Sequence, residues 1–289
     1  MLEKLSWSTA LCLAALITGC GGKTDDEPAS PKAPGFEVED PGPVHVHGLG
    51  VNPADGALFV ATHTGLFRAA EGEEKARRVA DRYQDTMGFT IAGPNRFLGS
   101  GHPDGRDRLP PFLGLIRSTD AGRTWTPVSL QGEADFHILE AEGRRVYGFG
   151  SDFETRREQL LVSDDGGKRW SARRTPASLI ALDVAPDDPQ RLIASGDRQL
   201  YRSENGGRSW REAEGPAGLL ARLGRDLLVA EDTGALSKST DEGRSWQRVG
   251  AIGGQPAAFE GGETLLVALH DGTIKQSDDG KEWTVRARP

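Results

Sequence analysis

Apolar and polar residues follow one another along this chain in short segments, and the pattern recurs about every 36 to 45 residues. In one repeat, apolar residues concentrate in Leu179–Val184, Arg191–Ser195 and Gln199–Ser203, with a turn rich in Pro and Asp after the first segment. A fourth segment begins at Arg211. Short apolar segments bounded by turn residues are typical of strands in all-β proteins. Four strands in a repeat of about 40 residues predict the blade of a β-propeller.

Six such repeats begin near residues 45, 85, 135, 178, 217 and 255. They predict an all-β fold, a six-bladed β-propeller that occupies residues 44–289. A seven-bladed propeller is the alternative, and it would need a further repeat that the sequence does not contain. We expect the ring to close between Thr284–Ala287 and the segment around Phe36–Val46.

Five repeats contain the motif S-x-D-x-G-x-x-W, in a looser form in the last repeat, and the first repeat has Ala69–Gly72 in its place. Asp and Ser side chains accept hydrogen bonds from nearby backbone N–H groups and so stabilise tight turns. The glycine allows a positive φ, and the tryptophan covers the turn with a large apolar surface. Calcium binding is the alternative role, but no glutamate completes a ligand set. The predicted structural residues are Asp120, Asp165, Asn205, Asp241 and Asp278, with Trp125, Trp170, Trp210, Trp246 and Trp283.

This motif resembles the Asp-box, or BNR, repeat of the sialidase superfamily of β-propellers. The chain also resembles a group of bacterial exported propeller lipoproteins that are named glycosyl hydrolases by analogy. That resemblance covers most of the chain after the N-terminal segment and implies the fold, although a fold alone does not determine an activity. It rests on residues 44–50 (VHVHGLG), 61–67 (ATHTGLF), 87–89 (MGF), 100–103 (SGHP), 114–118 (GLIRS) and 132–137 (GEADFH).

The resemblance to sialidases implies three substrate-binding arginines, a Tyr–Glu nucleophile pair, an Asp acid and an early Arg-Ile-Pro motif. The chain has no Arg-Ile-Pro sequence, and His-Val-His-Gly stands in that region, so we do not expect sialidase activity. A glycoside hydrolase of another specificity is the alternative function. Its two carboxylates would be Asp85 and Asp135.

The N-terminal segment predicts export. Met1–Lys4 precedes the apolar run Leu5–Ile17, which is too short to span a bilayer as a mature helix, so residues 1–19 are interpreted as a signal peptide. Ile17–Cys20 resembles the bacterial lipobox, so we expect an acylated Cys20 and a membrane-anchored lipoprotein of the bacterial cell envelope. A secreted protein with an unmodified Cys20 is the alternative. Residues 20–43, rich in Gly, Pro and charge, predict a flexible tether.

Composition narrows the range of partners. Cys12 and Cys20 are the two cysteines of the chain, so the domain after the signal peptide has none for a disulfide, a Cys-ligated metal or a thiol nucleophile. A formal charge of −8 argues against general nucleic-acid binding, which needs a basic face. We expect a monomer whose partners are the membrane, through its lipid, and a small-molecule, glycan or protein ligand.

The histidines fall at equivalent places in the repeats. Three open first strands and three close second strands, and these two ends of a blade meet on one face of a propeller. The motif turns join third to fourth strands and so lie on the opposite face. Long insertions at 101–113 and 151–159 belong to the histidine face, where propellers usually keep their sites. The first group is His45, His47 and His137, and the second is His63, His102 and His270.

Three interpretations of this cluster remain open. Neutral imidazoles are common metal ligands, so the first is a site for copper, zinc or iron. The second is an enzyme that uses His and Asp as acid–base groups on a polar substrate. The third is a scaffold whose buried histidines bond to the backbone. The candidate ligand or metal residues are His47, His63, His102, His137, His270 and Met87.

Overall fold

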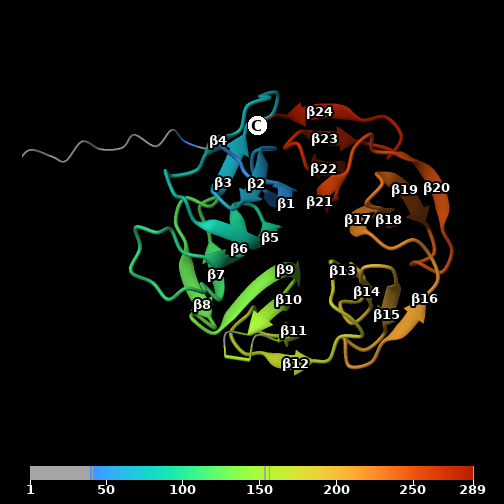
Figure 1. The fold of residues 1–289 in the computed structure, drawn as a ribbon, viewed down its shortest axis with the longest axis horizontal. Helices are drawn as coiled ribbons and strands as arrows, with labels where there is room; N and C mark the ends of the chain where they lie inside the picture. The colour runs from blue at the N-terminus through green and yellow to red at the C-terminus, as the bar shows by residue number, and fades with distance from the viewer. Residues whose placement is uncertain (1–39, 41, 153, 156, 289) are drawn as a thin grey trace, which may run out of the picture. The chain divides into compact units, whose positions relative to one another are not determined.

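The computed structural model describes residues 40, 42–152, 154–155 and 157–288. The predicted signal peptide, Cys20 and most of the predicted tether lie outside these residues. The described chain forms six four-stranded antiparallel sheets arranged as blades around a central channel (Figure 1), which confirms the predicted six-bladed β-propeller. The blades begin at residues 46, 85, 134, 181, 219 and 256, close to the predicted starts.

Each blade is built from four consecutive strands, with the first nearest the channel and the fourth outermost. Blade 1 contains β1 (Val46–Val51), β2 (Leu58–Thr62), β3 (Gly65–Ala69) and β4 (Arg77–Arg78). Blade 2 contains β5 (Asp85–Gly93), β6 (Arg96–His102), β7 (Leu115–Ser118) and β8 (Thr126–Ser129). Blade 3 contains β9 (Ala134–Glu142), β10 (Arg145–Asp152), β11 (Glu158–Ser163) and β12 (Ser171–Arg173).

Blade 4 contains β13 (Ala181–Val184), β14 (Leu192–Ser195), β15 (Leu200–Ser203) and β16 (Arg211–Ala213). Blade 5 contains β17 (Leu219–Leu223), β18 (Asp226–Ala230), β19 (Ala235–Ser239) and β20 (Gln247–Ala251). Blade 6 contains β21 (Pro256–Glu260), β22 (Leu265–Leu269), β23 (Ile274–Ser277) and β24 (Thr284–Ala287). Among the described residues, no helix has the length and apolar character needed to cross a membrane.

The hydrophobic core is divided into layers between adjacent blades. Successive side chains of a strand point to opposite faces of its sheet, so one strand contributes to two layers. In β2, Leu58 and Val60 pack with residues of blade 6, whereas Phe59 and Ala61 pack with residues of blade 2. All five residues of β2 are buried, which explains why the second strands read as continuous apolar runs in the sequence.

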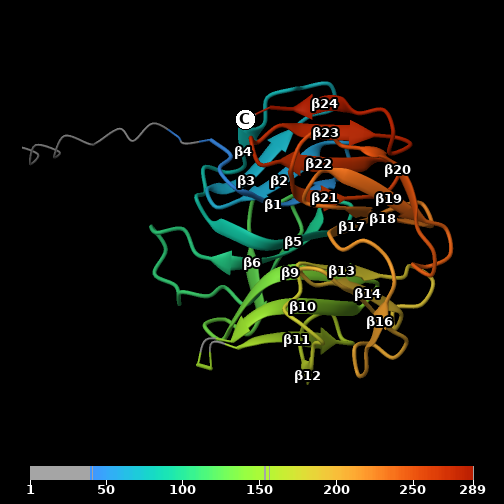
Figure 2. The ribbon, with the colours of Figure 1, turned by 45° about the vertical axis from the view of Figure 1, so that its right-hand side comes forward.

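Closure of the ring differs from the sequence-based prediction. β24 pairs with β23 as the fourth strand of blade 6, because consecutive residues already supply all four strands of that blade. The chain end then contacts blade 1 outside the sheet: Arg288 forms a parallel bridge with Lys75, and Arg286 donates to the carbonyls of Ala70 and Glu73 at 3.1 and 3.0 Å. Figure 2 shows blade 6 beside blade 1. This contact involves the part of the first repeat around Ala69–Gly72, which stands in place of the motif.

The motif turns are held by the predicted side chains. In blade 2, Ser118 Oγ accepts the N–H of Gly122 at 2.8 Å and donates to Asp120 at 2.8 Å. Asp120 in turn accepts the N–H of Thr124 at 2.9 Å. These hydrogen bonds lower the pKa of Asp120 against the effect of burial. The same arrangement recurs at Asp165, Asn205 and Asp241.

The last motif turn corrects one predicted residue. Asp279, not Asp278, accepts the backbone N–H groups of Lys281 and Glu282, at 2.8 and 3.0 Å. Ser277 takes the place of the motif serine and accepts the N–H of Gly280 at 2.8 Å, three residues along instead of four. The turn is one residue shorter, so the acceptor carboxylate moves one position along the chain.

The motif turns also fasten each blade to the preceding one. Trp170 donates its indole N–H to Ser129 of blade 2 at 2.9 Å, and Trp210 and Trp246 donate to backbone carbonyls of the preceding blades at 3.1 and 3.0 Å. Within a blade, Gly166 of the motif turn donates to Arg144, in the turn between β9 and β10, at 2.8 Å. The motif turns therefore lie at the ends where first strands finish, opposite the histidines.

We expect Gly167→Ala to destabilise the propeller by about 2–4 kcal/mol. Gly167 has a φ of +85°, and a Cβ there would lie 2.0 Å from Leu115 Cδ2 of the neighbouring blade. Gly166→Ala is the matched control, because its φ is +77° but no heavy atom lies within 4 Å of the added Cβ. Thermal unfolding would show the larger loss for Gly167→Ala, and equal losses would contradict the role of interblade packing.

Candidate functional site

Three donor atoms converge at the channel mouth on the histidine face. His47 Nε2 lies 3.2 Å from His63 Nδ1, and His63 Nδ1 lies 2.9 Å from Asp85 Oδ1. His47 Nε2 and Asp85 Oδ1 are 3.9 Å apart. Among the described residues, these three form the one group of His, Cys, Asp or Glu side chains whose ligand atoms all lie within 4.8 Å of one another.

Irregularities in strand pairing place side chains at this mouth. The register between β1 and β2 shifts between Val46 and Gly48, so His47 is the extra residue of a β-bulge. Such bulges redirect a side chain, often beside a functional site. Corresponding shifts occur at Met87 in β5, His137 in β9 and Ala257 in β21.

Positions two residues before each bulge are equivalent as well. Asp85 and Asp135 hold this place in blades 2 and 3, and His45 holds it in blade 1. Across the first hairpin, Asp85 pairs with His102, at the end of the second strand. The equivalent second-strand place in blade 1 belongs to His63. Equivalent positions of the repeat thus place polar side chains next to one another at the channel mouth.

A chain of polar contacts extends the cluster into blade 3. His102 Nδ1 lies 3.1 Å from Asp85 Oδ2, and His102 Nε2 lies 3.6 Å from Asp135 Oδ2. His137 Nε2 lies 3.2 Å from the same oxygen of Asp135. The Asp135 side chain is 7 % exposed, and its Oδ1 has no hydrogen-bond partner among the described residues. His102 therefore stands between two carboxylates.

The electrostatic environment shifts the pKa values of His47 and His137 in opposite directions. Burial lowers the pKa of His47 to about 4, and the nearby His63 acts in the same direction. The hydrogen bond that His137 donates to the Asp135 carboxylate raises the pKa of His137 against the effect of burial. His47 is therefore neutral at neutral pH, which is the protonation state in which an imidazole binds a metal.

Most of the predicted site residues come together. His47, His63 and His102 join Asp85, Asp135 and His137 in the contacts above. His270 is exposed at the end of β22 and, in the described part of the chain, forms no side-chain contact with this cluster. Met87 is half-buried and likewise shows no polar contact to it. His45, which was not among the predicted ligand residues, packs against His47 and His63 with ring centroids 6.2 and 5.2 Å away.

Acidic side chains within the channel were not identified from the sequence. A cavity of about 140 Å³ touches all six innermost strands and reaches from His47 and His137 to Glu140 and Glu260. Glu140 and Glu260 come from blades 3 and 6, on opposite sides of the ring. Burial raises the pKa of Glu140 well above its usual range and that of Glu260 to about 7. The sequence did offer one signal for these glutamates. Both are charged residues in segments predicted as first strands, which line the channel.

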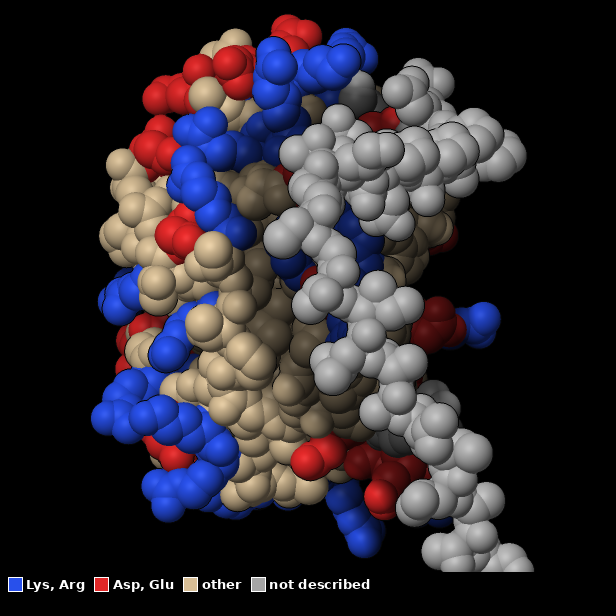
Figure 3. Space-filling view, turned by 90° about the vertical axis from the view of Figure 1, so that its left-hand side faces the viewer, with Lys and Arg blue, Asp and Glu red and all other residues tan. Residues whose placement is uncertain are grey.

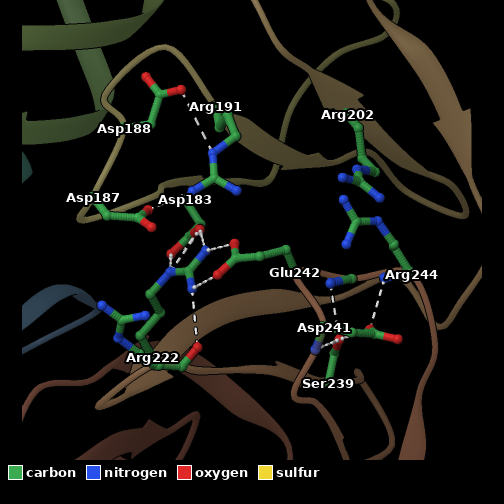
Figure 4. A network of polar contacts seen from close by, with 12 residues as sticks. Asp183, Asp187, Asp188, Arg191, Arg202, Arg222, Ser239, Asp241, Glu242 and Arg244 are labelled. Atoms are coloured by element: carbon green, nitrogen blue, oxygen red, sulfur yellow. Dashed lines mark hydrogen bonds and ion pairs between the residues drawn. The ribbon is translucent and has the colours of Figure 1, made fainter.

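A third channel carboxylate is neutralised by an arginine (Figure 4). Arg222 of β17 donates Nε and Nη2 to Asp183 of β13, at 2.9 and 2.7 Å, and also Nη1 and Nη2 to Glu242 at 3.1 and 2.9 Å. Glu242 belongs to the motif turn of blade 5. Burial nevertheless raises the pKa of Asp183. Glu140 and Glu260 have no such partner among the described residues.

The mouth residues suit a metal ion by donor type and spacing. An ion bound tetrahedrally at about 2.1 Å from each ligand separates two ligand atoms by about 3.4 Å. The three distances among His47, His63 and Asp85 bracket that value. Two imidazole nitrogens and one carboxylate oxygen suit zinc, copper or iron, and three protein ligands leave a coordination position open.

Charge on the outer surface is mixed. Figure 3 shows one side of the molecule, where Asp and Glu side chains are interspersed with the Lys and Arg side chains. This side does not present the continuous basic area that nucleic-acid binding needs.

Comparisons with known proteins bear on the fold. No family model matches the chain, and no curated protein sequence matches it. An ancestral GH74 enzyme has a similar structure, with a TM-score of 0.54, 13 % identity, and coverage of 84 % of this chain and 38 % of that one. This chain therefore spans well under half the length of that enzyme.

Two structures of YCF48 are also similar. YCF48 from Cyanidioschyzon merolae has a TM-score of 0.51, 14 % identity and coverage of 85 % of each chain. YCF48 bound to a D1 peptide has a TM-score of 0.45, 16 % identity, and coverage of 71 % of this chain and 67 % of that one. The chain belongs to the structural class of β-propellers, which hosts many functions.

We expect Glu260→Gln to stabilise the protein at pH 8 by about 1–3 kcal/mol and to have little effect at pH 5. In the unfolded chain the glutamate ionises near 4.5, whereas in the fold its pKa is about 7. The folded protein thus holds the extra proton between these values, and stability falls as pH rises through them. Urea unfolding at both pH values measures the effect. Glu212→Gln, in exposed outer strand β16, is the control, and an equal change there would contradict the assignment.

Proposed function

We propose that this propeller binds a divalent transition-metal ion at its channel mouth, through His47 Nε2, His63 Nδ1 and Asp85 Oδ1. The observation that carries the proposal is the convergence of these atoms within 2.9 to 3.9 Å of one another. They come from three strand ends in two blades. The local sequence cannot bring them together, and the fold does.

Hydrogen-bond chemistry supports an ion over a set of self-satisfied histidines. His63 Nδ1 lies within hydrogen-bond distance of both His47 Nε2 and Asp85 Oδ1. A ring nitrogen offers either one proton or one lone pair in the ring plane, so it cannot donate to Asp85 and accept from His47 together. A metal ion removes this conflict, because each of the three atoms then presents a lone pair to one centre.

The outer partners of the ligands have the arrangement found around metal sites. Ligands are usually oriented by a further hydrogen bond to a carboxylate, carbonyl or imidazole. Here Asp85 presents Oδ1 to the proposed ion and Oδ2 to His102, and His102 faces Asp135 with its other nitrogen. His102 and Asp135 then act as positioning residues, which differs from the ligand and catalytic roles predicted for them.

The cellular setting follows from the N-terminal sequence. We infer an exported protein, anchored in the bacterial cell envelope by lipid on Cys20, and an Asp-box propeller of the sialidase superfamily. The motif-turn hydrogen bonds support the Asp-box assignment. The coordination position that these three residues leave open would take the ligand, a small molecule, a glycan or a side chain of a partner protein.

Glycoside hydrolysis is the alternative and is less well supported. Asp85 and Asp135 are separated by about one imidazole ring, a separation compatible with the carboxylate pairs of glycosidases, about 5–10 Å. That ring is His102, however, and it occupies the space where a glycosidic bond would have to lie. The similarity to a GH74 enzyme at 13 % identity reflects the fold. Turnover of aryl glycosides that is lost in Asp135→Asn would favour the hydrolase.

We expect the metal-free protein to bind one equivalent of Zn²⁺ or Co²⁺, and His63→Ala to weaken that binding by at least about 100-fold, because a ligand is removed outright. Calorimetric titration with Co²⁺ and competition with Zn²⁺ measure both constants. His270→Ala is the matched control, since this exposed histidine of the same face lies outside the cluster. Substoichiometric binding, or equal losses in both variants, would rule the site out.

We expect His102→Leu to weaken Co²⁺ binding about 10- to 100-fold without changing the stoichiometry, because Asp85 loses the group that orients it. His102→Asn should restore part of the affinity, since its amide N–H occupies the place of Nδ1 against Asp85 Oδ2. A loss of stoichiometry in His102→Leu would instead make His102 a direct ligand.

A further inference from the structure

We infer that His45 is a further ligand of the ion proposed at His47, His63 and Asp85. This inference rests on the proposed function. His45 precedes β1 and is exposed at the channel mouth. It is therefore accessible to an ion, as is the exposed His63, whereas His47 and Asp85 are half-buried.

The ring positions are compatible with a shared ion. An ion bound at about 2.1 Å to a ring nitrogen lies about 3.2 Å from the ring centroid, so two imidazoles on a tetrahedral ion have centroids about 5.2 Å apart. The His45 centroid lies 5.2 Å from that of His63 and 6.2 Å from that of His47. The His47 and His63 centroids are 4.3 Å apart. The His45–His63 separation matches the tetrahedral value, and the longer His45–His47 separation requires the exposed His45 ring to rotate toward the ion.

The repeat gives His45 the same place as known members of the cluster. Asp85 stands two residues before the bulge of blade 2, and Asp135 stands two residues before the bulge of blade 3. His45 stands two residues before the bulge of blade 1. In each of these blades, this place directs a group with a lone pair toward the mouth.

The backbone holds His45 at a cost. Its φ is 54°, in the left-handed region that is uncommon for non-glycine residues, although histidine adopts it more readily than most. Such strain is typical of functional positions whose geometry the surroundings impose. Here the N–H of His63 lies 3.2 and 3.4 Å from the carbonyls of Val44 and His45, and Asp40 pairs with Arg78, so the segment is fastened beside the ligands.

The experiment compares wild type, His45→Asn and His45→Gly in Co²⁺ titrations followed by visible absorption. Asn and Gly both tolerate positive φ, so each keeps the chain path and removes the imidazole. We expect both variants to bind Co²⁺ with a dissociation constant about 10- to 100-fold higher, and with a changed ligand-field spectrum. His45→Gly should also raise the melting temperature of the metal-free protein by about 2–4 °C, through loss of the strain.

The outcomes distinguish the two proposals. Wild-type protein that binds no stoichiometric Co²⁺ would overturn the proposed function, and this inference with it. Wild-type binding with unchanged affinity and spectrum in His45→Asn would overturn this inference alone and leave the three-ligand site standing. His270→Asn, at the equivalent face of blade 6, is the control and should leave the spectrum unchanged. Weaker binding and a changed spectrum in both His45 variants, with neither change in His270→Asn, support His45 as a ligand.

Discussion

Each blade of this propeller is stable only because its neighbours cover both of its faces. The strands place alternate side chains in two different interblade layers, as β2 does with Leu58 and Val60 on one side and Phe59 and Ala61 on the other. A single blade would expose both of its apolar faces, so stability depends on completion of the ring. The contacts of Arg286 and Arg288 with the loop at 70–75 join blade 6 to blade 1, and within residues 42–288 each blade is built from its own four consecutive strands.

The same constraint explains why the two faces have different chemistry. On one face, the motif turns pack glycine against the preceding blade and donate tryptophan N–H groups to it, so that face is committed to holding blades together. On the other face, bulges at His47 and His137 release side chains from the regular pleat and direct them to the channel mouth. Polar residues can gather there because the interblade layers already supply the stability.

The fold could be predicted from the sequence because short local sequence patterns define each repeat. The strand period, the turn residues and the motif each depend on a few neighbouring positions, and the blade starts follow from them. The site was predicted only in part. His47, His63 and Asp85 could be assigned to one face, but their convergence depends on bulges, which are a property of strand register. Asp279 replaced Asp278 because the last turn is one residue shorter, which only its hydrogen bonds reveal.

The carboxylates along the channel differ in how their charge is compensated. Asp183 is balanced by Arg222, whereas Glu140 and Glu260 face the channel without a basic partner among the described residues. Burial favours the protonated forms of both glutamates, which lowers the negative charge of the channel interior. The ion proposed at the mouth would lie beside the carboxylate of Asp85, which His102 connects to Asp135. The proposed site therefore lies at the mouth, where Asp85 is close to His47 and His63, and not among the channel glutamates.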